Sequence, residues 1–462
     1  MNIFPLCLNL KVLQDLNLDT LNTTMLKRTL LIFLFLSLFN LNVILPQNNP
    51  SDIKQALEYF SEAKALSELD SGKLWGIKLY GPMLFVNPET RFIIANEPDN
   101  DNYLEMKGDA YCGTLPKEVN IANTSLEWKG KKWTMVMLPL PDNKLERTSL
   151  MMHELFHRIQ SKLNLTQYST PCNHLDQKDA RILLRMEWQE LILAFKTVKQ
   201  EKLAHIKNTL TLNKSRISLY PGADTLESQM ELNEGLAEYT GLKLTGQPVD
   251  TIINYEIQKI NMADMIPSFV RSFAYVSGPL YCFLLDDSGI QWRNKITGKT
   301  KLTDLLRDAY SINLDDDSLK VVHDLKGYDK YSGIIKFENE RELKHQEQIT
   351  HLKDKFINKP VIIIPLQNMN IQFDPRNLVP IENLGTVYPN LRITDNWGIL
   401  TVTNDALLSS DWQTIWISLP DNFTDQMKSG YIKSTDWVLE LKKGWGLKPA
   451  ERKGSYILTK ID

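Results

Sequence analysis

The chain has 462 residues, of which 43% are hydrophobic and 24% charged, and its formal net charge at pH 7 is −3. This composition is typical of a globular protein, and the length suffices for two or three domains. Without a basic excess to neutralise phosphates we expect no nucleic-acid partner. The four cysteines include no Cys-x-x-Cys pair. This argues against a zinc ribbon, a thioredoxin-type motif and a disulfide framework.

The N-terminal region combines a basic stretch with an apolar run. Residues 25–29 (MLKRT) follow an upstream extension and precede an apolar segment from Leu30 to Pro46. This order is typical of a secretory signal peptide. We therefore expect residues 1–47 to be an extension plus signal peptide, and the protein to be secreted or to lie in the cell envelope (the periplasm). An uncleaved signal anchor is the alternative, and it would be the chain's one link to a membrane.

Residues 48–335 predict strands first and then mostly helices. Strands are expected within 74–95 and over 131–138, after a helix at 51–70. The remaining helices are expected at 145–162, 178–206, from near Leu226, 268–286 and 301–311. Strands followed by helices indicate an α+β domain with a mixed N-terminal sheet. Residues 51–130 fit either this domain or a pro-region.

The C-terminal quarter has a different sequence pattern. Residues 336–359 are charged and helix-like, which predicts a connecting helix. Residues 360–462 contain short β-rich segments, such as VIIIPL, GILTVT and TIWISL, separated by Asn, Asp, Pro and Gly. They predict a small all-β domain of sandwich type. Its tryptophans fit either buried sandwich positions or a sugar-binding platform: Trp397, Trp412, Trp416, Trp437 and Trp445.

The strongest functional signal is the segment HELFH at residues 153–157. Residues four apart share one face of a helix, so His153 and His157 can bind one Zn²⁺ while Glu154 reaches a metal-bound water. The neighbouring residues are mostly apolar, which predicts a buried helix whose polar groups need partners. A metal would supply them. The alternative is a chance polar face on a buried helix.

A second segment, LNEGLAEY at residues 232–239, offers the missing ligand. A catalytic zinc site uses three protein ligands and leaves a fourth position for water, and Glu234 is the candidate for the third. Glu238 lies one turn further on the same face, where a carboxylate can accept the spare N–H of a ligating histidine. A solvated acidic face is the alternative, which the small and apolar neighbours disfavour.

His-Glu-x-x-His followed by Asn-Glu-Gly-Leu-Ala-Glu-Tyr resembles the gluzincin metallopeptidases. It is most similar to the aminopeptidase N-like branch, and the thermolysin-like enzymes share the spacing of the two carboxylates. The resemblance covers residues 130–285. It implies a zincin-like catalytic domain and a peptide or protein substrate. It further implies that His153, His157 and Glu234 bind zinc, that Glu154 is the general base, and that Glu238 orients a ligand.

The segment YVSG at residues 275–278 is similar to the Tyr-x-Lys-Gly segment of the same branch. The resemblance implies that the hydroxyl of Tyr275 stabilises the oxyanion of the reaction. A core tyrosine is the alternative, and Tyr281 and Tyr239 are weaker candidates for the same role.

The sequence departs from the gluzincin pattern in two ways, and each leads to a prediction. The long interval between His157 and Glu234 predicts an insertion over or beside the cleft. No Gly-x-Met-Glu-Asn segment is present, which argues against an exopeptidase.

We also expect strand 131–138 to be the sheet edge along which an extended substrate lies. Besides a zinc peptidase, the sequence fits a zinc hydrolase of another bond, or a non-catalytic zinc-fold protein that binds a ligand or partner.

Overall fold

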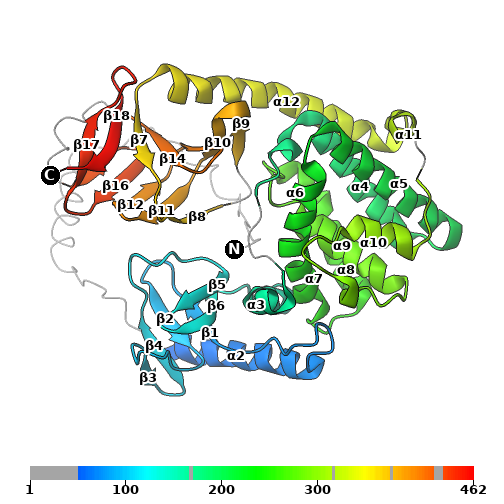
Figure 1. Ribbon diagram of the computed structural model, residues 1–462. Coiled ribbons are helices and arrows are strands. Elements are labelled where there is room, and N and C mark those ends of the chain that lie inside the picture. The colour runs from blue at the N-terminus through cyan, green and yellow to red at the C-terminus, as the bar shows by residue number, and fades with distance from the viewer. Residues whose placement is uncertain (1–49, 166–169, 315–317, 375–377, 421–429, 462) are drawn as a thin grey trace, which may run out of the picture.

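The computed structural model describes residues 50–165, 170–314, 318–374, 378–420 and 430–461. Figure 1 shows three regions: an N-terminal sheet, a group of helices, and two C-terminal sheets. The predicted α+β class is confirmed. The segment expected to be a signal peptide, residues 1–47, lies outside the described residues. Among the helices of the described ranges, none has the length and apolar character needed to cross a bilayer.

The N-terminal sheet has six strands in the order β3-β4-β2-β1-β6-β5. β1 pairs antiparallel with β2 and parallel with β6, so the sheet is mixed. Along β1, Phe85 stacks on Phe60 of helix α2 (Pro50–Asp70), while Leu84 joins an apolar cluster on the opposite face. The strands are β1 (Met83–Val86), β2 (Phe92–Ala95), β3 (Glu105–Lys107), β4 (Ala110–Thr114), β5 (Thr124–Trp128) and β6 (Lys131–Met137).

The strand order corrects one expectation from the sequence. The strand predicted at 131–138 is present as β6, but it pairs with β1 on one side and with β5 on the other. Its placement at the sheet edge was therefore wrong, because both of its hydrogen-bonding edges are used. The edge strand on this side of the sheet is β5.

Helices dominate the middle of the chain. The predicted helix at 178–206 is two helices, because Thr197 and Val198 adopt extended backbone conformations between them. α8 was not predicted. The helices are α3 (Lys144–Ile159), α4 (Lys178–Lys196), α5 (Lys199–Leu219), α6 (Ala223–Met230), α7 (Leu236–Lys243), α8 (Val249–Asn261), α9 (Ala274–Asp287), α10 (Leu302–Ala309), α11 (Ser318–Lys326) and α12 (Ser332–Lys353).

The C-terminal region follows α12 and consists of two sheets, of seven and five strands. Apolar residues from both sheets form one core, which includes the buried Trp397 and Trp437. The strands are β7 (Val361–Pro365), β8 (Asn370–Phe373), β9 (Val379–Ile381), β10 (Gly385–Tyr388), β11 (Leu391–Asp395), β12 (Gly398–Val402), β13 (Ala406–Ser409), β14 (Thr414–Ser418), β15 (Tyr431–Lys433), β16 (Trp437–Leu441), β17 (Trp445–Pro449) and β18 (Tyr456–Lys460).

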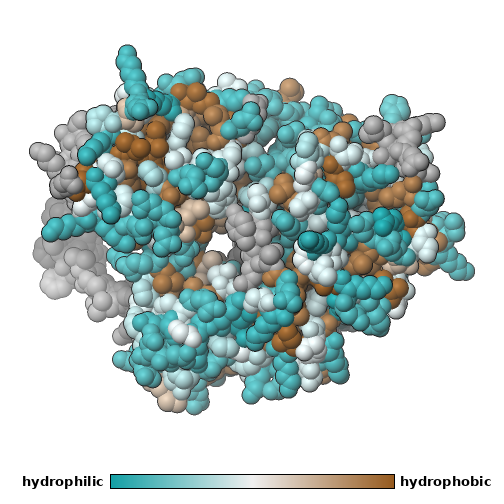
Figure 2. Space-filling view, viewed as in Figure 1, coloured by the Kyte–Doolittle hydropathy of each residue, from teal (hydrophilic) through white to brown (hydrophobic). Residues whose placement is uncertain are grey.

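The C-terminal sheets also touch the N-terminal sheet region. Arg392 on β11 donates hydrogen bonds to the side chain of Asn120 and to the carbonyl oxygen of Lys117, both at 2.8 Å. Both acceptors lie in the loop before β5. In Figure 2 hydrophilic side chains are spread over all three regions, and apolar ones occur in scattered groups. The contact between the β regions thus includes hydrogen bonds between polar groups.

Candidate metal site

Helix α3 carries the HELFH segment and is fixed at its start by Asn143. The side-chain oxygen of Asn143 accepts hydrogen bonds from the backbone N–H groups of Leu145 and Glu146 at 2.9 and 3.3 Å, a standard N-cap. Apolar residues along the helix are buried in the main core. His153 and Glu154 are 4% and 3% exposed. The helix therefore holds its polar face inside the protein, as its sequence predicts.

Glycines let the neighbouring helices approach closely. A Cβ on Gly241 of α7 would lie 2.5 Å from the backbone oxygen of Ser149 on α3. A Cβ on Gly278 of α9 would lie 2.4 Å from the Cα of Gly235. Real Cβ atoms do not tolerate such distances, so α7 packs backbone to backbone against α3, and α9 against the turn that ends at Gly235. This packing brings residues from three separate segments to one place.

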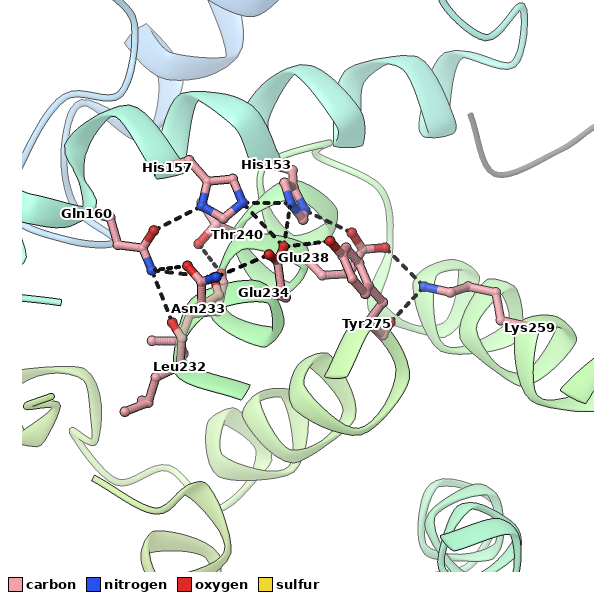
Figure 3. Close-up of polar contacts among 11 residues, drawn as sticks. His153, His157, Gln160, Leu232, Asn233, Glu234, Glu238, Thr240, Lys259 and Tyr275 are labelled. Carbon is pink, nitrogen blue, oxygen red and sulfur yellow. Dashed lines mark hydrogen bonds and ion pairs between the residues drawn. The ribbon is translucent and has the colours of Figure 1, made fainter. Parts of the chain in front are cut away.

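Glu234 lies on a π-helical turn, η3 (Glu231–Gly235), between α6 and α7. The turn holds one more residue per hydrogen-bonded loop than an α-helix, and such turns occur frequently at functional sites. It ends at Gly235, where the backbone meets α9. The turn thereby sets the direction in which Glu234 leaves the backbone, toward the histidines of α3 (Figure 3).

Three ligand-type atoms lie close together. The Nε2 atoms of His153 and His157 are 3.1 Å apart. Oε2 of Glu234 lies 3.6 Å from Nε2 of His153 and 3.4 Å from Nε2 of His157. Among the residues that the structure describes, His153, Glu154 and His157 form a group that can hold a metal ion, with ligand atoms within 4.8 Å of one another. Glu234 adjoins this group.

The other ring nitrogen of each histidine has its own partner. Nδ1 of His153 lies 3.0 Å from Oε2 of Glu238, and Nδ1 of His157 lies 2.9 Å from Oε1 of Gln160. The amide of Gln160 donates to Oδ1 of Asn233 at 3.2 Å, and the amide of Asn233 donates to Glu234 at 3.1 Å. Acceptors at Nδ1 favour the tautomer whose Nε2 lone pair can bind a metal.

Electrostatics tie the histidines to the carboxylates. Burial disfavours the charged form of His153, but hydrogen bonds with Glu234 and Glu238 outweigh burial and raise its pKa to about 10. The pKa of His157 is raised by the same balance between burial and Glu234. Burial raises the pKa of Glu234, yet both histidines hold it well below its ordinary value. The carboxylates therefore favour the protonated imidazole of His153 when no metal is bound.

Glu154 lies beside this group with one oxygen unused. Its Oε2 atom is buried and has no hydrogen-bond partner within the described ranges. The side chain lines a pocket of about 160 Å³, together with His153, His157, Glu234 and Tyr275. Buried carboxylate oxygens normally find partners, so a free acceptor at a pocket wall is suited to take a proton from a bound molecule.

Tyr275 also reaches the group. Its hydroxyl donates a hydrogen bond to Oε2 of Glu234 at 2.6 Å, and its ring lies parallel to that of His153 with centroids 5.7 Å apart. Burial and the charge of Glu234 raise its pKa well above the ordinary value, so the hydroxyl stays a donor. The weaker candidates point elsewhere: Tyr281 contacts Glu187 and Tyr239 contacts Asp286.

The segment between His157 and Glu234 includes two long helices that contact α9 through one of them. It supplies α4 and α5, and Trp188 of α4 donates a hydrogen bond to the hydroxyl of Ser277 on α9 at 2.8 Å. Ser277 stands where the resembled Tyr-x-Lys-Gly segment has lysine. The described residues that line the pocket include none between His157 and Asn233. Trp188 thus links α4 to α9. That the interval is an insertion over or beside the cleft stays a prediction.

Sequence reasoning missed three residues of the site: Gln160, Asn233 and Lys259. Gln160 lies three residues after His157 and Asn233 directly precedes Glu234, so their spacing was an available signal. Lys259 lies on the unpredicted helix α8 and contacts Glu238 (Figure 3). No feature of the local sequence links α8 to the HELFH segment.

Comparisons with known proteins give no match for this chain. No family model, no curated protein and no solved structure matches it. The structure therefore establishes that His153, Glu154 and His157 form a group that can hold a metal ion.

Proposed function

We propose that this chain is a zinc-dependent metallopeptidase of the gluzincin type, with His153, His157 and Glu234 as zinc ligands. One observation carries the proposal. The three ligand atoms form a triangle with sides of 3.1, 3.4 and 3.6 Å. Ligands bonded to tetrahedral zinc at about 2.05 Å are about 3.3 Å apart, because the tetrahedron edge is about 1.6 times the bond length. The triangle matches one face of that tetrahedron.

The surrounding residues fit a zinc centre as well. Two imidazoles and one carboxylate are a common ligand set of catalytic zinc, with the fourth position open to water. Glu238 and Gln160 occupy the Nδ1 sides of the histidines, as outer partners of zinc-binding histidines do. The pocket meets the ligand triangle at Glu154, so the open position and the unused carboxylate oxygen lie together.

Each remaining residue has a chemical role in this proposal. Bound zinc would supply Lewis acidity toward a water molecule and the scissile carbonyl. Glu154 takes the proton of the attacking water on its free oxygen and later delivers it to the leaving amine. Tyr275 donates its hydroxyl proton in a hydrogen bond to the developing oxyanion, after turning from Glu234. Glu238 and Gln160 fix the orientation of the two imidazole rings.

The substrate side of the pocket is the outer strand β5. The pocket wall includes Thr124 and Ser125 of β5 and the preceding Asn123. The side-chain oxygen of Asn123 accepts a hydrogen bond from the backbone N–H of Met137 at 2.8 Å, and its buried amide nitrogen has no hydrogen-bond partner in the described part of the chain. An extended peptide paired with β5 would lie across the zinc position by strand addition. Strand pairing favours a peptide over other substrates.

The N-terminal segment suggests where the reaction takes place. We propose that residues 1–47 act as an upstream extension and signal peptide and that the enzyme works outside the cytoplasm, as secreted or envelope protein. N-terminal sequencing of the mature protein tests this: a start near residue 48 supports it, and an intact Met1 in the cytoplasmic fraction contradicts it.

A peptide-cleavage assay tests the proposed function. Purified protein is incubated with a mixture of quenched fluorescent peptides, with and without 1,10-phenanthroline. We expect cleavage that the chelator abolishes, that added zinc restores, and that Glu154→Gln lacks. Cleavage that survives both the chelator and the substitution contradicts the proposal. Bound zinc without cleavage by the wild type would favour the non-catalytic alternative.

A further inference from the structure

A buried lysine lies next to the proposed zinc site. Lys259 on α8 is 7% exposed, and its ammonium group has three oxygen partners. It donates to Oε1 of Glu238 at 3.0 Å and to the backbone oxygen of Tyr275 at 2.9 Å (Figure 3). It also donates to Oε1 of Glu256 at 2.8 Å. An ammonium group has three N–H donors, so all of them are used.

Such a lysine is not a passive surface charge. Burying an ammonium group costs free energy unless it is paired and hydrogen-bonded, so its geometry is well defined. Glu256, three residues earlier on the same helix, holds it from α8. Its other two partners belong to α7 and α9. Lys259 therefore ties together the two helices that carry the residues around the ligand triangle.

Both of these partners also contact a residue of the ligand triangle. Glu238 accepts from Lys259 with Oε1 and contacts Nδ1 of His153 with Oε2, at 3.0 Å in each case. Tyr275 accepts from Lys259 with its backbone oxygen, while its hydroxyl contacts Glu234 at 2.6 Å. The lysine thus reaches His153 through one partner and Glu234 through the other.

We infer that Lys259 is a positioning residue of the zinc site, which fixes the orientation of His153 through Glu238 and the position of Tyr275 through its backbone oxygen. The inference rests on the proposed zinc site and adds a residue to it. It differs from a merely structural ion pair in one respect. A structural pair would contribute to the stability of the fold alone, whereas a positioning residue changes zinc affinity through Glu238.

The test is a double-mutant cycle on zinc affinity. The zinc dissociation constant of the full chain is measured by competition with a chromogenic chelator, for wild type, Lys259→Met, Glu238→Gln and the double variant. Loss of an outer partner of a zinc ligand typically weakens binding about 10- to 100-fold. We expect each single variant to weaken zinc binding about tenfold, and the double variant to bind no more weakly than the weaker single variant.

Glu256→Gln is the matched control, since it removes the charge of a partner of Lys259 that does not contact the triangle. Burial raises the pKa of Glu256 to about 7, although Lys259 lowers it, so a neutral side chain is tolerated there. We expect its zinc affinity to stay within about twofold of wild type, well under the change from losing an outer partner. Thermal unfolding of all metal-free variants shows which of them are folded. If Lys259→Met does not fold, the Lys259→Met/Glu256→Gln variant, which removes both charges, replaces it.

Three results separate the outcomes. Weaker zinc binding by Lys259→Met that disappears in the Glu238→Gln background supports the inference. Unchanged binding by Lys259→Met, or effects that multiply in the double variant, overturns it while the zinc site stands. A wild type that binds no zinc overturns the proposed function and this inference with it.

Discussion

Two buried polar clusters lie on either side of α9 and contain similar residue types. The first, the metal cluster, consists of His153, Glu154, His157, Glu234 and Tyr275. The second, the arginine cluster, consists of His174, Glu187, Arg216, Glu227, Glu231 and Tyr281. Each cluster contains histidine, glutamate and one tyrosine from α9. The π-turn η3 serves both, because it carries Glu231 and Glu234.

The clusters differ in where their positive charge comes from. In the arginine cluster the fully buried Arg216 binds both oxygens of Glu227, at 3.1 and 2.7 Å, and contacts Glu187. Its cation is permanent and belongs to the chain. In the metal cluster the raised pKa of His153 favours a protonated imidazole, whose proton a metal can replace, and one Glu154 oxygen has no partner among the described residues. Buried histidines and carboxylates alone therefore do not indicate a metal site; the adjoining pocket distinguishes the metal cluster.

The largest expected effect is on catalysis in the metal cluster. Glu154→Gln keeps the size of the side chain but cannot take a proton, so we expect kcat to fall about 10²- to 10⁴-fold, the usual contribution of a general base. Zinc content and thermal unfolding should match wild type, because Glu154 is not one of the three proposed ligands. Peptide-cleavage kinetics and metal analysis check this, and an unchanged kcat would remove Glu154 from the mechanism.

In the arginine cluster the same kind of change should affect stability instead. Arg216→Met leaves Glu187 and Glu227 buried without their cation, which costs about 3–5 kcal/mol of unfolding free energy. Glu231→Gln is the control, because burial and the neighbouring carboxylates raise the pKa of Glu231 well above its ordinary value and it is already neutral. Urea denaturation measures both. Equal stability of the two variants would contradict the description of a closed ion network.

The backbone contact between η3 and α9 should give a smaller effect that reaches the metal cluster. Gly278→Ala places a methyl group 2.4 Å from the Cα of Gly235, and such overpacking costs about 1–3 kcal/mol. Zinc affinity should also fall, because Glu234 and Tyr275 flank this contact. Gly333→Ala in α12 meets nothing within 4 Å and should be neutral or slightly stabilising. If Gly278→Ala behaves like Gly333→Ala, the close approach is not required.

The smallest expected signal is a proton. His153 has a pKa of about 10 in the metal-free cluster, so zinc binding at pH 7 should displace about one proton from it. Titration calorimetry in buffers of different ionisation enthalpy counts the released protons. A raised pKa stabilises the metal-free fold fully below about pH 6.5, the ordinary histidine pKa, and the effect is lost as pH rises toward 10. No proton release, or metal-free stability that rises across this range, would contradict the assignment.

Local patterns predicted much of this molecule. The apolar residues around HELFH predicted a buried α3, and the four-residue spacing of Glu234 and Glu238 placed both on one side of a helical segment. Strand-rich segments before and after the helices predicted the α+β class. In each case the information lies within a few turns of one element.

Long-range packing explains what could not be predicted. Whether β5 or β6 forms the sheet edge depends on the pairing of β6 with β1, more than 40 residues earlier in the chain. The break between α4 and α5 falls at two β-branched residues, Thr197 and Val198, where the helical pattern continues on both sides. Lys259 reaches Glu238 because α8 packs beside α7 and α9, and such contacts are set by tertiary structure.

The measurement that tests the central claim most directly is zinc per chain in purified protein, by plasma emission spectrometry, for wild type, Glu234→Ala and Glu231→Gln. The two glutamates lie three residues apart on η3, but each belongs to a different cluster. We predict about one zinc in wild type and in Glu231→Gln, and much less in Glu234→Ala. Equal zinc in all three would remove Glu234 from the ligand set, and no zinc in wild type would contradict the metal site.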